Sequence, residues 1–328
     1  MKVLVTGGAG YVGSHTVKAL ARAGHDPVVL DNFSTGRREL VRSRVVIEAD
    51  LADPSALRRA FEGEKFQAVL HFASRIEVGE SVADPQTYYA HNLVGGLNLL
   101  QAMREAGVKR FVFSSSAAVY GVPRETPIDE THPLRPVNPY GRTKLFFENI
   151  LEDFDRAYGL QSISLRYFNA AGADPEGELG EMHDPESHLI PNVLLSALGR
   201  NDGLSLYGTD FPTPDGTAVR DYVHVTDLAR AHVLALENLS SGGRSDALNL
   251  GTGRGHSVLE VIKKAEEVAG RPIPFIRRPP RPGDVAFLVA SRTKAERALG
   301  WKPELSDLET ILRTAWRWHL KTHGPQRH

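Results

Sequence analysis

Short apolar runs alternate with helix-like spacing of apolar residues over the first half of the chain. Between the runs, apolar side chains recur three or four residues apart, as at Val17 and Leu20. Strands that alternate regularly with helices are typical of a parallel sheet covered by helices on both faces. The sequence therefore predicts a doubly wound α/β fold. The runs lie at residues 3–5, 27–30, 45–49, 68–73 and 110–113.

The alternation loosens after residue 168, where a second region is expected to begin. Residues 173–188 are rich in Gly, Pro and charged side chains. Two later helical patterns each begin after a serine that can act as N-cap, Ser257 and Ser291. We therefore divide the chain into domains at 1–168 and 169–328. The expected later elements are helices at 227–238, 257–269 and 291–299, a strand at 247–250 and, earlier in the chain, helices at 56–61 and 85–106.

Composition narrows the class of protein. The 328 residues can bury a large core, and the formal net charge of -1 argues against a dedicated nucleic-acid or membrane-surface binder. No cysteine is present, which excludes disulfides, thiolate metal sites and a catalytic thiol. The N-terminal residues lack a signal-peptide pattern, and no apolar run is long enough to span a bilayer. We expect a soluble, cytoplasmic protein with small-molecule partners.

A glycine-rich turn follows the first predicted strand. Gly7, Gly10 and Gly13 allow a tight turn, close approach of the backbone to a pyrophosphate, and close packing of the next helix on the strand. The second strand ends in Asp31, where a carboxylate can bind both adenosine ribose hydroxyls and repel a 2'-phosphate. This pattern predicts a Rossmann-type NAD site, although Arg37 and Arg38 leave a phosphate contact, and hence NADP, open.

Polar residues also follow other predicted strands. Ligands of such sheets bind at the carboxyl ends of the strands, where Asp50 and Ser74 fall. Asp50 is equally suited to cap the next helix. Asn92 lies inside a predicted helix and either faces solvent or holds backbone and water near the site.

The segment 138–144 carries the candidate chemistry. Tyr140 and Lys144 are four residues apart at the start of an expected helix, so they share one face. A tyrosine is a poor base at neutral pH unless a neighbouring cation stabilises the phenolate. Ser116, at the end of another strand, can share a substrate hydroxyl with that phenolate. Taken alone, the pair also fits an ordinary helix surface. No metal-ligand cluster and no Gly-x-Ser-x-Gly motif is recognisable.

Together these residues resemble the extended short-chain dehydrogenase/reductase superfamily and, over nearly the whole chain, its UDP-galactose 4-epimerase family. The resemblance implies transfer of a hydride from the sugar to tightly held NAD and back, which interconverts UDP-galactose and UDP-glucose, and a smaller, interleaved α/β substrate domain to which 219–250 does not belong. The block 215–225 is the most specific of the matching motifs. The motifs are 6–15, 78–81, 114–121, 140–144, 165–169, 190–192, 215–225 and 249–253.

Particular residues argue against some neighbouring activities. The 4,6-dehydratases need an Asp-Glu pair after the catalytic hydroxyl, and this chain has Ala117 and Ala118 there. Decarboxylating relatives and epimerases of UDP-uronates, pentoses or hexosamines remain open. A non-catalytic NAD-sensing protein is disfavoured, because Ser116, Tyr140 and Lys144 are all present.

The resemblance also implies site residues and a homodimer formed by helices near 85–106 and 140–158. The cofactor residues are Gly7, Gly10, Tyr11, Val12, Gly13, Asp31, Asn32, Ser34, Asp50, Leu51, Phe72, Ala73, Ser74, Asn92, Ser114, Tyr140, Lys144 and Tyr167. The substrate residues are Ser116, Tyr140, Asn169, Asn192, Val193, Leu194, Ser205, Tyr207, Arg220, Tyr222, Arg281, Asp284 and Leu288.

Three of these substrate residues carry further hypotheses. Arg220 is expected to bind the diphosphate, although an ion pair with Asp221 is the alternative. Asp284 matches a ribose-binding acid, although Pro-Gly-Asp is also a turn sequence. Leu288 stands where epimerases restricted to glucose and galactose have tyrosine, so N-acetylated UDP-hexosamines are expected to fit as well.

Overall fold

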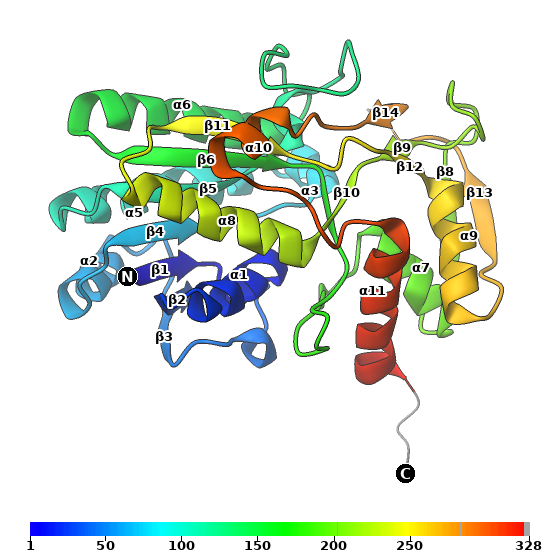
Figure 1. Cartoon of the computed structure of the whole chain (residues 1–328), viewed down its shortest axis with the longest axis horizontal. Helices are drawn as coiled ribbons and strands as arrows, with labels where there is room; N and C mark the ends of the chain where they lie inside the picture. The colour runs from blue at the N-terminus through cyan, green and yellow to red at the C-terminus, as the bar shows by residue number, and fades with distance from the viewer. Residues whose placement is uncertain (202, 282–283, 325–328) are drawn as a thin grey trace.

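The centre of the protein is a seven-stranded sheet with the order β11-β6-β5-β4-β1-β2-β3, in which neighbouring strands are parallel (Figure 1). The computed structural model describes residues 1–201, 203–281 and 284–324. The strands are β1 (Lys2–Thr6), β2 (Asp26–Asp31), β3 (Val45–Glu48), β4 (Ala68–His71), β5 (Arg110–Ser116), β6 (Gln161–Tyr167) and β11 (Asp246–Leu250).

Helices cover both faces of this sheet because β1 and its neighbours are apolar on both sides. Val3 and Val5 pack in one core cluster and Leu4 packs in the other, as alternation along a strand requires. The doubly wound α/β prediction is confirmed. The first face carries α1 (Tyr11–Arg22), α8 (Val225–Ser240) and α10 (Thr293–Leu299), and the second carries α2 (Pro54–Gly63), α5 (Gly95–Glu105) and α6 (Pro139–Tyr158).

The helix expected at 85–106 is interrupted by one wider turn. It runs as α4 (Pro85–Tyr89), a π-helical turn (Ala90–Val94) and then α5. Asn92 lies on the π turn and is buried. Its side chain bonds both backbone groups of Arg75 and donates to Thr143 Oγ1. The buried alternative for Asn92 is therefore confirmed, and π turns of this kind are frequent at functional sites.

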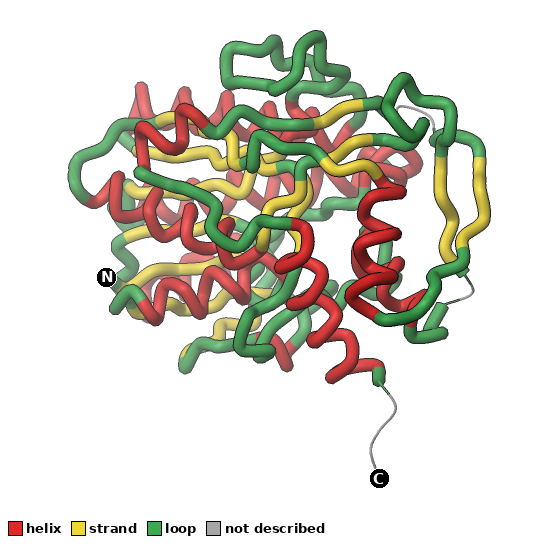
Figure 2. Tube along the Cα trace, turned by 45° about the vertical axis from the view of Figure 1, so that its right-hand side comes forward, coloured by secondary structure: helices red, strands yellow, loops and turns green. Residues whose placement is uncertain are grey.

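The remaining elements form a smaller body beside the carboxyl edge of the sheet (Figures 1 and 2). Its core lies between α7 (Leu189–Ala197), α9 (Val258–Ala269) and α11 (Leu308–His323). Within the segment 219–250, α8 and β11 lie with the large sheet, whereas β9 joins a small sheet. The division of the chain into two domains stays a prediction. The small sheets pair β7 (Asn169–Ala171) with β10 (Tyr222–His224), β8 (Leu204–Tyr207) with β13 (Phe275–Arg278), and β9 (Val219–Arg220) with β12 (His256–Ser257) and β14 (Phe287–Leu288). The short helices are η1 (Arg38–Leu40), α3 (Val78–Ala83) and η3 (Ala117–Val119).

One of the two expected serine caps is correct. Ser257 forms a full capping box with Glu260 at the start of α9. Ser291 is not the N-cap of α10, which begins at Thr293 after Arg292. The reason is that the backbone N–H of Ser291 donates to Ile128 O, so the chain is still extended there.

Buried histidines make the fold sensitive to acid. Burial lowers the pKa of His71 to about 3 and those of His15, His224, His232 and His319 to about 4. In the unfolded chain these groups bind a proton near pH 6.5. Between about pH 6 and 4 the unfolded state therefore holds more protons, and each histidine lowers the free energy of unfolding by up to about 1.4 kcal/mol per pH unit.

We predict that His232→Leu reduces the slope of the unfolding free energy against pH in this range. The reduction should correspond to about one fewer proton bound on unfolding. His232 is fully buried in α8, and leucine cannot take up a proton. Urea unfolding at several pH values measures the slope. The difference between the variant and the unmodified chain at pH 7 gives the effect of altered packing, which is subtracted. An unchanged slope would contradict the assignment.

Candidate active site

The candidate catalytic residues lie where β5 ends and α6 begins. Asn138 caps α6 by accepting a hydrogen bond from Gly141 N at 2.8 Å, and Pro139 occupies the first helical turn. A Cβ at Gly141 would lie 2.6 Å from Ala118 O, so only glycine lets α6 approach η3 this closely. This approach brings Tyr140 next to Ser116.

Lys144 is buried beneath this helix turn and has two fixed contacts. Its Nζ donates to Ser74 Oγ and to Ser114 O, both at 2.9 Å, and lies 5.7 Å from the centre of the Tyr140 ring. Only 3% of Lys144 is exposed, so the interpretation of the pair as an ordinary surface is wrong. Burial lowers the pKa of Lys144 to about 7, while Glu148 opposes the shift.

Tyr140 is partly buried and has a raised pKa. Burial is the main cause, a hydrogen bond with Ser116 acts in the opposite direction, and the charge of Glu77 adds to the rise. The phenol therefore needs additional positive charge nearby before it can act as a base at neutral pH.

A second tyrosine, Tyr167, lies at the end of β6 beside the same strand edge. Its hydroxyl is 2.5 Å from Ser114 Oγ, and Ser116 is its register partner across the sheet. Burial raises the pKa of Tyr167. Ser114 thus connects Tyr167 and Lys144, which are both predicted cofactor residues.

The glycine turn has the close packing that a dinucleotide site requires. Gly7 adopts φ +71°, and a Cβ there would lie 2.5 Å from Ala73 N; a Cβ at Gly13 would lie 2.2 Å from Gly7 O. Gly10 precedes α1 without a side-chain cap, so the first amides of α1 are free of side-chain competition. Tyr11 donates to Gly172 O at 2.6 Å, and Val12 packs partly into the core. These residues fit a bound pyrophosphate.

Asp31 and its surroundings favour NAD over NADP. Its buried carboxylate accepts hydrogen bonds from Ala9 N and Phe33 N, and burial raises its pKa. Arg38 forms an ion pair with Glu48, and Arg37 lies 3.6 Å from a carboxylate oxygen of Asp184. Both arginines that could contact a 2'-phosphate thus have acidic partners.

The other predicted cofactor residues line the same edge of the sheet. Asp50 accepts from Asn32 Nδ2 at 2.7 Å, whereas Asp53 caps α2, so the alternative role of Asp50 as that cap is wrong. Ser34 donates to Asn32 Oδ1. Leu51 is buried, and its carbonyl accepts from Asn98. The backbone amides of Phe72 and Ala73 both donate to Thr6 O, which fixes the turn beside Gly7.

The predicted substrate residues near α7 and β7 are already engaged with the protein. Asn169 Nδ2 donates to Asp221 O, and Asn192 Nδ2 donates to Glu186 O and His188 O. Val193 and Leu194 are buried in the core with α9 and α11, so only their backbone could contact a ligand.

Two arginines and their partners form a second polar group on the smaller body. Arg220 donates to Val219 O and Val285 O, and its Nη2 lies 4.0 Å from Asp284 Oδ1. Arg281 lies over the ring of Tyr207 at 4.4 Å. Burial lowers the pKa of Arg220 and raises that of the neighbouring Tyr222. Ser205 lies on β8 with Tyr207.

The alternative ion pair between Arg220 and Asp221 is wrong. The Asp221 carboxylate is fully buried and accepts hydrogen bonds from Thr252, Gly253 and Ala290 instead. Asp284 Oδ2 also accepts from Arg281 N at 3.3 Å, as the turn interpretation expects. Residues 282 and 283 of that motif lie outside the described residues.

Leu288 lies beside Arg220 in the parallel pair β14–β9. It packs, half-buried, against an apolar cluster that includes Val119 and Tyr120, directly after the Ser116 strand end. This places Leu288 between the candidate catalytic residues and the arginine group.

Comparisons with known proteins identify the family. Residues 3–251 match the model of the NAD dependent epimerase/dehydratase family. The chain belongs to this family. It is 53% identical over 321 residues to UDP-glucose 4-epimerase of Rhizobium leguminosarum bv. trifolii, covering 98% of each chain. Its structure is similar to that of UDP-glucose 4-epimerase from Brucella ovis in complex with NAD, with a TM-score of 0.94, 51% identity and coverage of 96% and 97%. It is also similar to the UDP-Glc/GlcNAc 4-epimerase of Campylobacter jejuni, with a TM-score of 0.85, 40% identity and coverage of 98% and 99%.

Some polar groups of this family member were not anticipated from the sequence. Glu148 and Arg166 form a buried ion pair behind Lys144. Glu181, His183, Glu186 and His188 converge in one loop, and the only signal for them was their close spacing.

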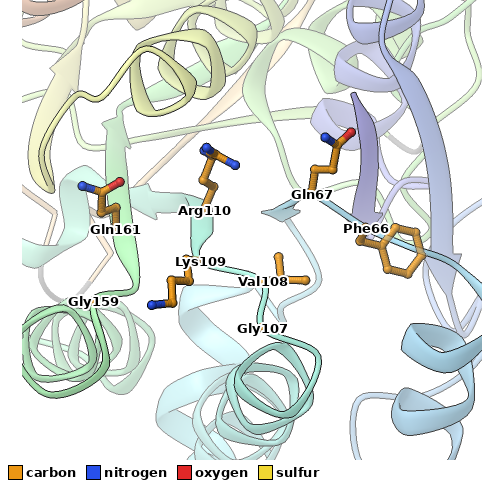
Figure 3. Close-up of a pocket in the computed structure, with 8 residues that line it drawn as sticks. All are labelled: Phe66, Gln67, Gly107, Val108, Lys109, Arg110, Gly159 and Gln161. Carbon is orange, nitrogen blue, oxygen red and sulfur yellow. The ribbon is translucent and has the colours of Figure 1, made fainter.

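A pocket between the starts of β4, β5 and β6, lined by Lys109 and Arg110 among others, lies at the amino edge of the sheet (Figure 3). It is therefore at the opposite edge from the candidate active site.

In the part of the chain that the structure describes, no helix combines the length and apolar character needed to cross a bilayer.

Proposed function

We propose that this protein interconverts UDP-galactose and UDP-glucose with NAD bound. The observation that carries the proposal is Lys144, buried and held by Ser74 and Ser114 one helical turn from Tyr140, with Ser116 beside the phenol. This arrangement is suited to removing the proton of an alcohol. The names of the relatives, which are at least 40% identical over nearly the whole chain, support the same reaction.

In the proposed reaction, Tyr140 removes the proton of the sugar 4-hydroxyl and Ser116 hydrogen-bonds the same oxygen. NAD, when bound, accepts a hydride from the sugar and returns it. Lys144 stabilises the phenolate by its charge, since its Nζ is 5.7 Å from the ring centre. Tyr140 finally returns the proton to the 4-oxygen of the product.

Inversion at the sugar carbon requires the 4-keto sugar to turn while the rest of the substrate stays bound. Arg220 and Arg281 are proposed to hold the diphosphate, because guanidinium groups bind phosphate oxygens in pairs. The guanidinium of Arg281 lies over the ring of Tyr207, and that of Arg220 lies 4.0 Å from Asp284. The remaining predicted substrate and cofactor residues keep the roles given in the sequence analysis as proposals.

The test is conversion of UDP-galactose to UDP-glucose by the purified chain without added NAD. Product formation is expected, because the cofactor is regenerated in each cycle and is expected to co-purify. If neither retained nor added NAD gives product, the proposal is wrong, and UDP-uronate, UDP-pentose and NAD-binding assays would distinguish another epimerase from a binding protein.

We predict that N-acetylated UDP-hexosamines are also substrates and that Leu288→Tyr selectively reduces their turnover. Leucine leaves more space than tyrosine beside Arg220, and a relative that is 40% identical is named for both plain and N-acetylated sugars. The measurement is the ratio of kcat/KM for UDP-N-acetylgalactosamine to that for UDP-galactose. We expect a decrease of about tenfold or more for a steric clash of this size.

Leu288→Ile is the matched control, since it conserves side-chain volume and should leave this ratio within about twofold. An unchanged ratio in Leu288→Tyr would remove Leu288 from its role in specificity, and the proposed epimerisation of plain sugars would still stand.

We also propose a homodimer through α5, α6 and the π turn. Val94, Leu97 and Phe146 are exposed apolar residues on these elements, and Tyr89 stacks on Phe146 at 6.5 Å. Sedimentation of the full chain tests the proposal, and a monomer at micromolar concentration would reject it.

The cytoplasmic location also stays a prediction, which cell fractionation can check.

A further inference from the structure

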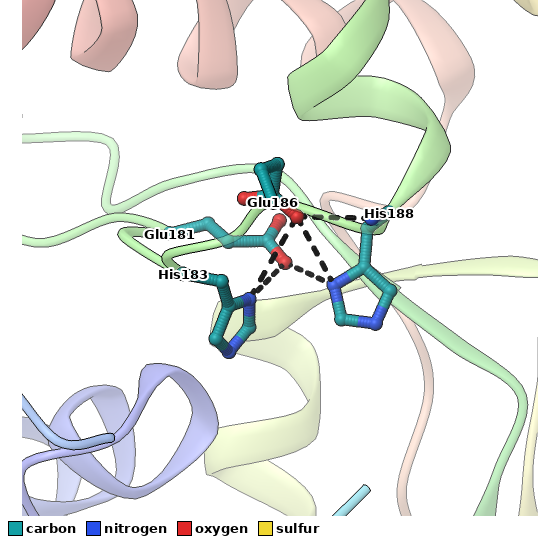
Figure 4. Close-up of side chains that lie close together, drawn as sticks. All are labelled: Glu181, His183, Glu186 and His188. Carbon is teal, nitrogen blue, oxygen red and sulfur yellow. Dashed lines mark hydrogen bonds and ion pairs between the residues drawn. The ribbon is translucent and has the colours of Figure 1, made fainter. Parts of the chain in front are cut away.

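Four side chains with metal-binding groups converge in the loop between β7 and α7 (Figure 4). They are Glu181, His183, Glu186 and His188, and one ligand atom from each lies within 4.8 Å of all the others. The Nδ1 atoms of His183 and His188 lie 3.0 and 2.5 Å from the same oxygen, Glu181 Oε1. They lie 3.9 and 3.7 Å from Glu186 Oε1. Each imidazole nitrogen therefore lies within 4.0 Å of both carboxylates, so the four atoms form one group instead of separate pairs.

The spacing of these atoms matches a small coordination shell. Ligand atoms in a tetrahedral zinc site are about 2.0–2.2 Å from the ion, which places them about 3.3 Å from one another. The four nitrogen–oxygen distances, 2.5, 3.0, 3.7 and 3.9 Å, average close to this value. Shifts of these atoms by up to about 0.8 Å would bring all four distances to the tetrahedral spacing.

The charges of the cluster are also suited to a bound cation. Glu181 is only 4% exposed. Within residues 1–201, 203–281 and 284–324, Glu181 and Glu186 have ion-pair contacts with these two imidazoles alone and with no lysine or arginine. Two carboxylates in a mostly buried site are stable when a metal ion or protonated partners compensate their charge.

The carboxylates are held in place by groups outside the cluster. Glu186 Oε1 accepts hydrogen bonds from the backbone amides of Ser187 and His188, both at 2.9 Å. The indole of Trp318 donates to the carbonyl of Glu181. Outer contacts of this kind orient the ligands of metal sites.

We propose that Glu181, His183, Glu186 and His188 bind one divalent transition-metal ion, with zinc as the representative ion. Two imidazole nitrogens with two carboxylate oxygens suit zinc and its neighbours in the first transition row. Magnesium and calcium prefer oxygen ligands alone and should bind poorly. Tetrahedral sites with four protein ligands are structural, so the ion would act on the fold and not on the substrate.

The position of the site indicates what such an ion would stabilise. The ring of His183 contacts Tyr11 of the glycine turn edge-on, with ring centres 6.3 Å apart. His188 immediately precedes α7, and its carbonyl accepts a hydrogen bond from Asn192. A bound ion would thus fix a loop that contacts the glycine turn through His183. The same loop leads into α7, which carries the predicted substrate residue Asn192.

The test uses the untagged full chain, dialysed against a chelator and titrated with Zn²⁺ and Co²⁺. Calorimetry should show one Zn²⁺ ion per chain, and Co²⁺ should give the visible absorption of a tetrahedral complex. The midpoint temperature of thermal unfolding should rise with Zn²⁺ and should not rise with Mg²⁺ at the same concentration. Binding of no Zn²⁺, or equal binding of Zn²⁺ and Mg²⁺, would overturn the proposal.

Two variants locate the site. His183→Gln and Glu181→Gln should each weaken Zn²⁺ binding by more than about tenfold, the lower bound for losing even an outer-shell contact. Glu176→Gln is the matched control, because Glu176 belongs to a neighbouring acidic group that already pairs with Lys18 at 2.9 Å. Its Zn²⁺ affinity should be unchanged. If Glu181→Gln fails to fold, His183→Gln decides, since His183 is partly exposed. Wild-type affinity in the folded variants would place the ion elsewhere.

Discussion

Tyr140→Phe is expected to reduce kcat for UDP-galactose by about a hundredfold to ten thousandfold, the usual contribution of a general base. The variant loses only the hydroxyl that exchanges a proton with the sugar. Its ring, which lies 5.7 Å from Lys144 Nζ, stays in place. The dissociation constant for UDP should change little, because the proposed diphosphate contacts come from Arg220 and Arg281.

Stopped assays of kcat and calorimetry with UDP measure the two effects separately. Tyr158→Phe is the matched control, since Tyr158 lies on the same helix, is 46% exposed and is distant in sequence from the active-site turn. Its kcat should equal that of the unmodified chain. Near-normal turnover of Tyr140→Phe would remove Tyr140 from its role as base.

Regular patterns made most of the large sheet predictable, although no strand was expected at the position of β6. The strands β1, β2, β4 and β5 are continuous apolar runs because both of their faces are covered. The glycine turn was equally clear, since Gly7, Gly10 and Gly13 follow directly after a short apolar run. Both signals are local, so a single sequence suffices to interpret them.

Long-range contacts explain what the sequence could not give. Ser291 has a suitable residue type for a cap, yet its amide is bound by Ile128, which is more than 150 residues earlier. The π turn at Asn92 depends on contacts with Arg75 and Thr143. Such pairings follow from tertiary packing, which no local pattern encodes.

Resemblance to a family supplied most of the candidate substrate residues, and the structure clarifies only their surroundings. It excludes the ion pair between Arg220 and Asp221 by giving Asp221 four other donor groups. It also shows Val193 and Leu194 in the core.

The buried ion pair between Glu148 and Arg166 lies behind the candidate catalytic residue Lys144. Arg166 donates to Glu148 through both Nε and Nη2, and Ser115 Oγ donates to Glu148 Oε1 at 2.5 Å. The side chains of Glu148 and Arg166 are only 8% and 6% exposed. Glu148 also acts on Lys144, since its charge opposes the fall in the pKa of the lysine.

We predict that Glu148→Gln lowers the free energy of unfolding by about 3–5 kcal/mol, because it leaves the charge of Arg166 buried without a partner. Urea unfolding at pH 7 measures the change. Glu152→Gln, one turn further along α6, is the matched control, since its pair with Arg156 is 61–71% exposed and should contribute less than about 1 kcal/mol. Similar values for the two variants would contradict the prediction.

The same substitution should also change the pH dependence of the reaction. Without the negative charge of Glu148, the pKa of Lys144 should fall below its present value of about 7, so the lysine is neutral at neutral pH. The phenolate of Tyr140 then loses its stabilising charge, and kcat at pH 7–8 should decrease even at temperatures where the variant is fully folded. A purely structural pair would reduce the free energy of unfolding and leave the pH profile of kcat unchanged, so this profile decides whether Glu148 affects the reaction through the pKa of Lys144.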